Sequence, residues 1–192
     1  MKKRDLLLFI GDSGSGKTTQ AEKIVELHPD RFSILVSTAT RDIRVGEVEG
    51  RDYYYVSIEE FHKRAMIESV EFPANSGKFY GVQASEFERI SGDMLLVVEP
   101  NGALQIKAYV ERHDLDINVV IIYMDIPKNE IRKTLLAQKI PEEEVEARLS
   151  RGDIPGDFTR LGLTADLSVK RLNSKTAESI IEWLDFNNEI YG

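Results

Sequence analysis

The sequence contains no cysteine, which excludes disulfides, thiol catalysis and thiolate metal sites and suits a reducing cytosol. Its three histidines offer little for a metal cluster. Basic residues are also few: 25 lysines and arginines face 33 acidic residues, and the formal net charge is −8. This balance argues against general nucleic-acid binding. Any affinity for phosphate must therefore come from basic groups placed locally.

Long hydrophobic runs are missing as well. The first run, at 6–10, follows Lys3 and Arg4 but is shorter than the roughly 7 to 15 residues of a signal-peptide core. Another run, at 119–124, is far short of the roughly 20 residues that span a membrane. We therefore expect a soluble, cytoplasmic protein with no export signal, no membrane partner and no nucleic-acid partner.

The composition is that of an ordinary globular domain. Apolar residues make up 42% and charged residues 30% of the 192 positions, with no repeats and no low-complexity segment. This length fits one domain, 1–192, with one cooperative core that carries insertions. We expect a monomer or a weak homodimer.

The strongest motif follows the first apolar run. Residues 6–10 are too few for a helix and do not alternate, which predicts a strand buried on both faces of a parallel sheet. Residues 11–18 then fit the phosphate-binding P-loop pattern G-x-x-x-x-G-K-[ST], between a strand and a helix. Glycines leave room for backbone N–H groups to wrap around a phosphate, while Lys17 would bridge the β- and γ-phosphates and Thr18 would ligate Mg²⁺. The predicted ATP-binding residues are Gly11, Asp12, Ser13, Gly14, Ser15, Gly16, Lys17, Thr18 and Thr19.

The rest of the chain alternates strands and helices, as expected of an α/β fold with a five-stranded parallel sheet flanked by helices. The further core strands are predicted at 34–36, 94–98, 119–124 and 167–169. Helices are predicted after the P-loop, from 101 to about 113, and after Ser174.

Two segments interrupt this pattern. Residues 38–82 combine a polar, glycine-punctuated loop, a capping box at Ser57 and a hairpin around 75–78, which predicts a small antiparallel insertion. Residues 128–156 hold two helices in which charge outweighs the apolar stripe, followed by glycine and proline breakers. We expect this second segment to be a mobile lid. The predicted core is 1–37, 83–127 and 157–192.

Several motifs occur in a specific order. The P-loop is followed by STATRDIRVGEVEGRDY at 37–53, by EFPANSGKFYG at 71–81, and by Asn-Gly-Ala at 101–103 after Glu99. In these segments the chain resembles the guanylate kinase family of nucleoside monophosphate kinases, along most of its length. The resemblance implies that the core binds ATP with Mg²⁺, that the insertion binds GMP or dGMP, and that a helical lid closes over both. Transfer would be direct and in line, without a covalent nucleophile.

The resemblance also assigns roles to single residues. Two arginines can fork onto phosphate oxygens, and tyrosine hydroxyls add donors without charge. The residues that would hold the acceptor phosphate are Arg41, Arg44, Tyr53 and Tyr80. The predicted catalytic residues are Lys17, Arg44 and Arg148, the last in the lid. The predicted substrate-binding residues are Ser37, Arg41, Arg44, Tyr53, Glu71, Tyr80, Gly81 and Glu99, and the predicted metal ligands are Thr18 and Glu99.

By the same resemblance, Ser37 and Glu71 fall at the positions where the family binds the base of the acceptor nucleotide. A carboxylate suits guanine, whose N1–H and N2 amine are donors, and repels the N1 acceptor of adenine. At Val82, however, the family usually places Ser or Thr, so a hydroxyl donor near the guanine carbonyl is missing, which costs about 1 to 3 kcal/mol if nothing replaces it. Glu99 stands where the family usually has the shorter Asp.

The lid departs from the family pattern too, and two other functions stay open. Arg148 matches an ATP-contacting arginine of the family. The upstream partner of that arginine has no clear counterpart here: Lys139 lies near its position, and Arg132 matches it only loosely. One alternative is a related P-loop kinase with another phosphorylated acceptor, which Val82 favours. The other is a non-catalytic binding module of the same shape, although such modules usually have a broken P-loop and this one is complete.

Overall fold

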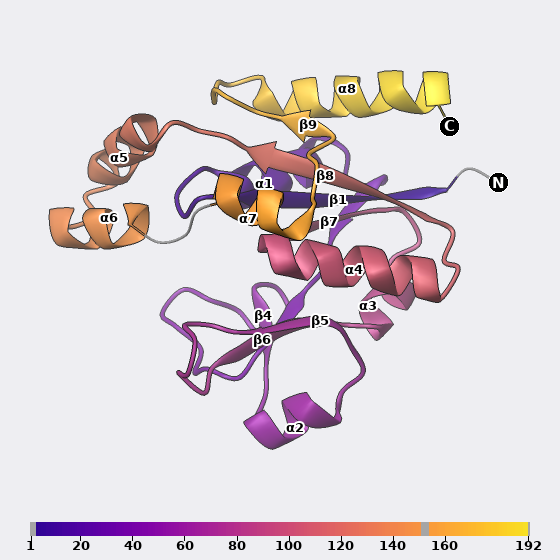
Figure 1. The fold of residues 1–192 in the computed structure, drawn as a ribbon, viewed down its shortest axis with the longest axis horizontal. Helices are drawn as coiled ribbons and strands as arrows, with labels where there is room; N and C mark the ends of the chain where they lie inside the picture. The colour runs from indigo at the N-terminus through magenta and orange to yellow at the C-terminus, as the bar shows by residue number, and fades with distance from the viewer. Residues whose placement is uncertain (1–2, 151–153, 192) are drawn as a thin grey trace.

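The computed structural model describes residues 3–150 and 154–191. Its centre is a sheet of five strands in the order β2-β7-β1-β8-β9, and every neighbouring pair is parallel (Figure 1). The strands are β1 (Arg4–Gly11), β2 (Phe32–Ile34), β7 (Asp93–Val97), β8 (Ile117–Met124) and β9 (Leu167–Ser168). The predicted five-stranded parallel sheet is confirmed.

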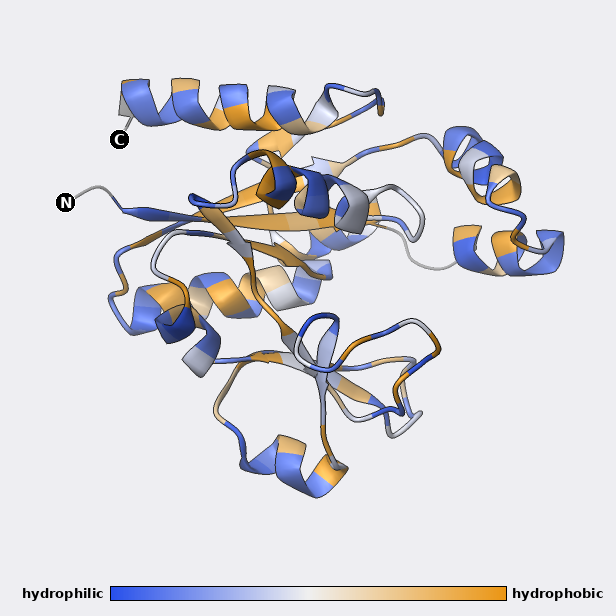
Figure 2. Ribbon diagram, turned by 180° about the vertical axis from the view of Figure 1, so that it is seen from behind, coloured by the Kyte–Doolittle hydropathy of each residue, from blue (hydrophilic) through white to orange (hydrophobic). Residues whose placement is uncertain are grey.

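Helices cover both faces of this sheet, which explains why β1 is apolar without alternation. Its central residues are fully buried and point alternately into two apolar clusters. One cluster includes Ala103 and Ile106 from α4 (Pro100–Arg112). The other includes Ala21 from α1 (Lys17–Leu27) and Ile180 from α8 (Thr176–Tyr191). Figure 2 shows the apolar central strands between these helices. Within the described ranges, no helix has the length and apolar character needed to cross a membrane.

The second core strand begins and ends two residues earlier than predicted. The prediction was 34–36, whereas β2 covers Phe32–Ile34. Leu35 still donates its N–H to Leu95 O, at 2.9 Å, but the next N–H, of Val36, turns to the side chain of Glu86, at 2.8 Å. The chain therefore leaves the sheet at Val36, which connects the core to the insertion.

The insertion is a second sheet of four strands in the order β4-β3-β6-β5. They are β3 (Ser37–Ala39), β4 (Tyr53–Tyr55), β5 (Met66–Glu71) and β6 (Phe79–Gln83). The β5-β6 hairpin is antiparallel as predicted, but β3 and β4 pair in parallel, so the sheet is mixed rather than antiparallel throughout. The loop between β3 and β4 returns the chain to the end of the sheet at which β3 begins, so that β4 runs in the same direction as β3. The predicted cap of α2 (Ile58–Lys63) is confirmed, since Ser57 Oγ accepts the N–H of Glu60 at 3.1 Å.

The segment predicted as a lid contains two helices that project from the core, α5 (Lys128–Ala137) and α6 (Glu142–Leu149) (Figure 1). Beyond them lies α7 (Ile154–Leu161), a helix that the glycine and proline breakers did not predict. Proline is tolerated in the first turn of a helix, where its N–H would have no intrahelical partner. Ile154 is buried in the core and the rings of Phe158 and Tyr123 lie 5.2 Å apart, so the start of α7 packs on the core.

Candidate active site

The P-loop joins β1 to α1 at the carboxyl edge of the parallel sheet. Gly14 and Gly16 have φ angles of 86° and 88°, which other residues rarely adopt. A Cβ atom on Gly16 would also lie 2.9 Å from Leu172 Cδ1. Ser15 is fully buried, and its Oγ has no hydrogen-bond partner among the described residues. The loop thus forms a tight anion-binding turn with an unpaired polar atom, which fits a bound phosphate.

Lys17 and Glu99 lie at this edge. Lys17 Nζ donates to the carbonyl oxygens of Gly11, at 2.6 Å, and Asp12, at 2.9 Å. Burial lowers the pKa of Lys17, while the charges of Glu99 and Asp12 oppose that shift. Burial raises the pKa of Glu99, and the nearby charge of Lys17 lowers it. The two side chains therefore interact where β1 and β7 end.

A further carboxylate reaches this edge from α7. The charge of Asp157 helps to raise the pKa of Glu99, after the larger effect of burial, and Asp157 also pairs with Arg160 at 2.6 Å. Sequence reasoning missed Asp157 because it predicted no helix there. The apolar spacing of Ile154 and Phe158, one helical turn apart, is the signal that could have indicated it.

The oxygen donors at the P-loop suit a metal ion that arrives with a nucleotide. Among residues 3–150 and 154–191, no three His, Asp or Glu side chains gather as a metal site. Thr18 is exposed at the start of α1, and Glu99 precedes α4. Two such donors are too few for a resident ion, but Mg²⁺ commonly binds one or two protein oxygens together with substrate phosphates. The donor set therefore fits a magnesium nucleotide.

One face of the insertion sheet brings together most of the predicted acceptor residues. Paired residues on neighbouring strands point to the same face, and successive residues alternate. Ser37 pairs with Tyr53, and Ala39 pairs with both Tyr55 and Tyr80. Because Ser37 and Ala39 are two residues apart, all five share one face, which we name the tyrosine face. The rings of Tyr53 and Tyr80 lie 5.9 Å apart.

Arg41 packs on the tyrosine face. Its guanidinium carbon lies 5.0 Å from the ring centre of Tyr53 and 5.6 Å from that of Tyr55. The side chain is only 7% exposed, and its Nε is buried without a hydrogen-bond partner among the described residues. A buried arginine held by aromatic rings, with a donor unsatisfied, is suited to bind a phosphate.

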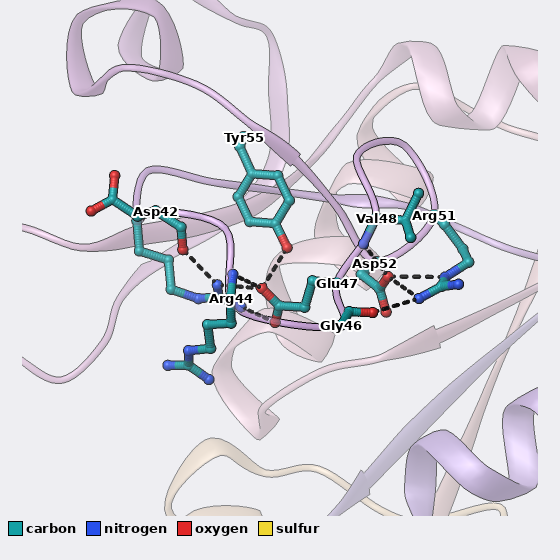
Figure 3. A network of polar contacts seen from close by, with 9 residues as sticks. Asp42, Arg44, Gly46, Glu47, Val48, Arg51, Asp52 and Tyr55 are labelled. Atoms are coloured by element: carbon teal, nitrogen blue, oxygen red, sulfur yellow. Dashed lines mark hydrogen bonds and ion pairs between the residues drawn. The ribbon is translucent and has the colours of Figure 1, made fainter.

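Glu47 neutralises Arg41. Its two oxygens accept from the Arg41 guanidinium at 2.7 and 2.6 Å, and one also accepts from Arg44 N, at 2.8 Å, and from the Tyr55 hydroxyl, at 2.7 Å. The bonds from Arg41, and then those from Tyr55 and Arg44, hold the pKa of Glu47 down to about 2. Sequence reasoning missed Glu47 and Tyr55; a carboxylate three residues after Arg44 was the available signal. The exposed Arg44 side chain points away from Glu47 (Figure 3).

The structure does not bring Glu71 to the tyrosine face, which corrects the sequence-based assignment. Glu71 pairs with Phe79, next to Tyr80, so it points to the opposite face, and its Oε1 accepts the N–H of Gly77 at 2.7 Å within the hairpin. Gly81 also belongs to that opposite face, where a Cβ would meet Phe61 at 3.2 Å.

Glu68 takes the place predicted for Glu71. It pairs with Val82, two residues from Tyr80, and therefore shares the tyrosine face. Glu68 is 6% exposed, and a Cβ on Gly102, in the first turn of α4, would lie 3.1 Å from its Oε2. Burial raises the pKa of Glu68 to about 7, although the N–H of Val82 partly opposes the shift. The carboxylate thus lies between the tyrosine face and the helix that follows Glu99.

Two arginines of the lid form ion pairs with glutamates of the lid itself. Arg148 of α6 donates to Glu144 of the same helix, at 2.5 and 3.1 Å. Arg132 of α5 pairs with Glu142 and Glu146. What the lid presents to the P-loop is apolar: a Cβ on Gly14 would lie 3.0 Å from both Ile131 and Leu135 of α5.

The fold and the site together define a P-loop α/β protein of the nucleotide kinase type. The P-loop lies at the carboxyl edge of a parallel sheet, and a second sheet carries an arginine on its tyrosine face. The family model described as guanylate kinase matches residues 3–151. A guanylate kinase from Anaplasma phagocytophilum (strain HZ) is 35% identical over 150 residues, 75% of this chain and 69% of the relative. One from Schizosaccharomyces pombe is 29% identical over 180 residues, 87% of this chain and 86% of the relative. The chain belongs to the guanylate kinase family.

Solved structures agree with this assignment. The crystal structure of guanylate kinase from Anaplasma phagocytophilum superposes with a TM-score of 0.65 at 25% sequence identity, and the match covers 97% of this chain and 87% of that one. A guanylate kinase from Geobacter metallireducens is 35% identical over 156 residues, 77% of this chain and 72% of the relative. The family's fold therefore extends beyond the residues that the family model matches.

Proposed function

We propose that this protein transfers the γ-phosphate of ATP to GMP or dGMP by direct in-line displacement. The observation that carries the proposal is the combination of a complete P-loop with Arg41, whose side chain is 7% exposed and packs on the tyrosine face of a separate sheet. Two phosphate-binding groups on two sheets suit a reaction between two nucleotides. The relatives' name, guanylate kinase, supports the same reaction.

On the donor side, the backbone of the P-loop would surround the β-phosphate, and Lys17 would move from its contacts with Gly11 O and Asp12 O to the β- and γ-phosphates. Thr18 and Glu99 would hold Mg²⁺ together with those phosphates. A bound Mg²⁺ ion would neutralise part of the charge on the transferred group. The nearby negative charges of Glu99 and Asp12 would favour the charged form of Lys17 that these phosphates attract.

On the acceptor side, Arg41 and the hydroxyls of Tyr53 and Tyr80 would hold the GMP phosphate. Glu47 would keep the Arg41 guanidinium oriented through two hydrogen bonds, and the buried Nε is a further donor that has no partner among the described residues. Arg44, exposed on the same loop, would join the phosphate when the nucleotide binds. Arg148 would leave Glu144 and approach the transferred phosphate when the lid closes, because water must be excluded to prevent ATP hydrolysis.

For the base, we propose that Glu68 rather than Glu71 reads guanine, with Ser37 on the same face. An ionised Glu68 would accept from N1–H and the N2 amine. Val82 is fully buried beside it and offers no hydroxyl to the base carbonyl. That missing donor favours the second candidate, a related P-loop kinase with another phosphorylated acceptor. A non-catalytic binding module has less support, because Lys17 and the glycine turn are intact.

A coupled assay of phosphate transfer from ATP, run with each common nucleoside monophosphate in turn, tests the proposal. We expect the highest kcat/KM with GMP or dGMP. A higher kcat/KM with another acceptor would favour the second candidate, and no turnover with any of them would favour the binding module. The protein would act on these small molecules in the cytoplasm, as a monomer or weak homodimer, which sedimentation at several concentrations can check.

A further inference from the structure

Two linkers join the insertion to the core. The first is Leu35-Val36, between β2 and β3. The second, at 84–92 between β6 and β7, contains the short helix α3 (Ser85–Arg89). Any movement of the tyrosine face relative to the P-loop requires these two segments to change conformation, because the chain crosses between the two sheets only there.

A buried carboxylate ties the two linkers together. Glu86 of α3 is 3% exposed, and its Oε2 accepts the N–H of Val36 at 2.8 Å. Arg89, one turn later, donates to both oxygens of Glu86, at 2.9 and 2.7 Å, and also to Ile34 O at the end of β2, at 3.1 Å. The Tyr54 hydroxyl of the insertion reaches Glu86 Oε1 at 3.3 Å. These three side chains and two backbone groups, from both linkers, β2 and β4, we name the linker clamp.

Within the linker clamp, Glu86 is an ionised side chain inside the protein, whereas the side chain of its partner Arg89 is 44% exposed. Burial alone would raise the pKa of Glu86, but the bonds from Arg89 and Val36 N–H hold that pKa below its usual value. A buried carboxylate is costly unless it is paired and hydrogen-bonded, and fixing one specific arrangement is a recognised reason for having such a group. Here the arrangement that is fixed is the path of the two linkers.

We propose that Glu86 and Arg89 are positioning residues for phosphoryl transfer, which hold the two linkers as one joint and so set the direction in which the tyrosine face approaches the P-loop. The proposal builds on the proposed function. Neither residue faces a nucleotide, because Tyr54, which contacts Glu86, alternates with Tyr53 and points away from the tyrosine face. They act through the distance and angle between the two phosphates, where a misplacement of about 1 Å can cost about 100-fold in rate.

The test compares Glu86→Ala with Asp5→Ala. Asp5 is another buried carboxylate, 1% exposed, bonded by Asn118 and Asn188 at the opposite edge of the sheet from the P-loop. Both variants should lower Tm. Glu86→Ala should also lower kcat/KM for GMP by about 10- to 100-fold, with KM for ATP within about twofold of wild type. Asp5→Ala should leave both kcat/KM for GMP and KM for ATP close to the wild-type values.

Conservative variants separate positioning from general loss of structure. Glu86→Gln keeps an oxygen that can accept from Val36 N–H but loses the ion pair, so it should recover part of the lost kcat/KM. Tyr54→Phe should cost about threefold or less, because its 3.3 Å contact is long. If Glu86→Ala and Asp5→Ala have the same kcat and KM for GMP, the positioning role is overturned.

Hydrogen exchange on the ligand-free protein tests the linker clamp independently of the reaction. Glu86→Ala should speed exchange of the amides at 35–36 and 84–92 by at least about tenfold, and leave those of β1 unchanged. Unchanged exchange at Val36 would overturn the clamp even if wild type phosphorylates GMP. If Glu86→Ala speeds exchange but the wild-type protein phosphorylates no acceptor, the linker clamp is supported and only the proposed function is overturned.

Discussion

The two regions that we propose to bind phosphate, the P-loop and the tyrosine face, are built in different ways. The P-loop uses eight consecutive residues and mostly backbone groups, whose shape is set by glycines with positive φ. The tyrosine face uses side chains from β3, β4 and β6 and a loop arginine whose charge Glu47 already balances. The first region is therefore fixed by backbone geometry, while the second depends on a network of side chains that a single substitution can disturb. The predictions below probe this difference.

The largest expected effect is that of Lys17→Ala. Lys17 is the main side chain of a region otherwise made of backbone, so its loss should lower kcat by about 1000-fold or more. GMP binding, measured by calorimetry, should stay close to wild type, because the acceptor residues belong to the other sheet. Turnover at the wild-type rate would contradict the assignment of the P-loop as donor site.

Arg41→Lys should show how far the tyrosine face depends on geometry rather than charge. Lysine keeps the positive charge but cannot form the two-pronged contact with Glu47 or with a phosphate. We expect KM for GMP to rise by about 100-fold, with KM for ATP nearly unchanged, in steady-state kinetics. Equal changes in both KM values would show that the two regions are not independent.

The stability of the protein should depend on Glu68 in a predictable direction. Its pKa is raised to about 7 by burial, so the folded state holds this proton more tightly than the unfolded chain. The favourable contribution of protonated Glu68 is complete below its unfolded pKa of about 4.3 and is lost as the pH rises through about 7.

Glu68→Gln removes this titration. Its free energy of unfolding, relative to wild type, should increase between about pH 5 and pH 8 by up to about 3 kcal/mol. Urea denaturation at several pH values measures the difference, with Glu71→Gln as the matched control on the opposite face. A difference that does not change with pH would mean that Glu68 ionises normally in the folded state.

The same contrast explains what could be predicted from sequence. The P-loop, β1 and the β5-β6 hairpin were predictable because each is defined by consecutive residues and a local period. Glu71 was misplaced for a geometric reason: it pairs with Phe79, next to Tyr80, and a strand side chain changes face with every residue. Which carboxylate reaches the tyrosine face therefore depends on the register of the β5-β6 hairpin, which the spacing from Tyr80 along the sequence does not reveal.

Other elements were missed because tertiary contacts decide them. α7 contains Pro155 and Gly156, which are unfavourable in most helices, but burial of Ile154 against the core compensates. β2 ends early because Glu86, fifty residues away, takes the N–H of Val36. Arg148 remains a predicted catalytic residue, and its present partner is Glu144.

We propose that recognition of guanine by the tyrosine face depends on Glu68. The most direct measurement is the ratio of kcat/KM for GMP to that for AMP, determined for wild type, Glu68→Gln and Glu71→Gln under the same conditions. An amide can donate to adenine N1, which the carboxylate repels, and it satisfies the guanine donors less well. Glu68→Gln should therefore lower the ratio by about 10- to 100-fold, and Glu71→Gln should leave it within about twofold. A ratio that falls with Glu71→Gln and not with Glu68→Gln would contradict the claim.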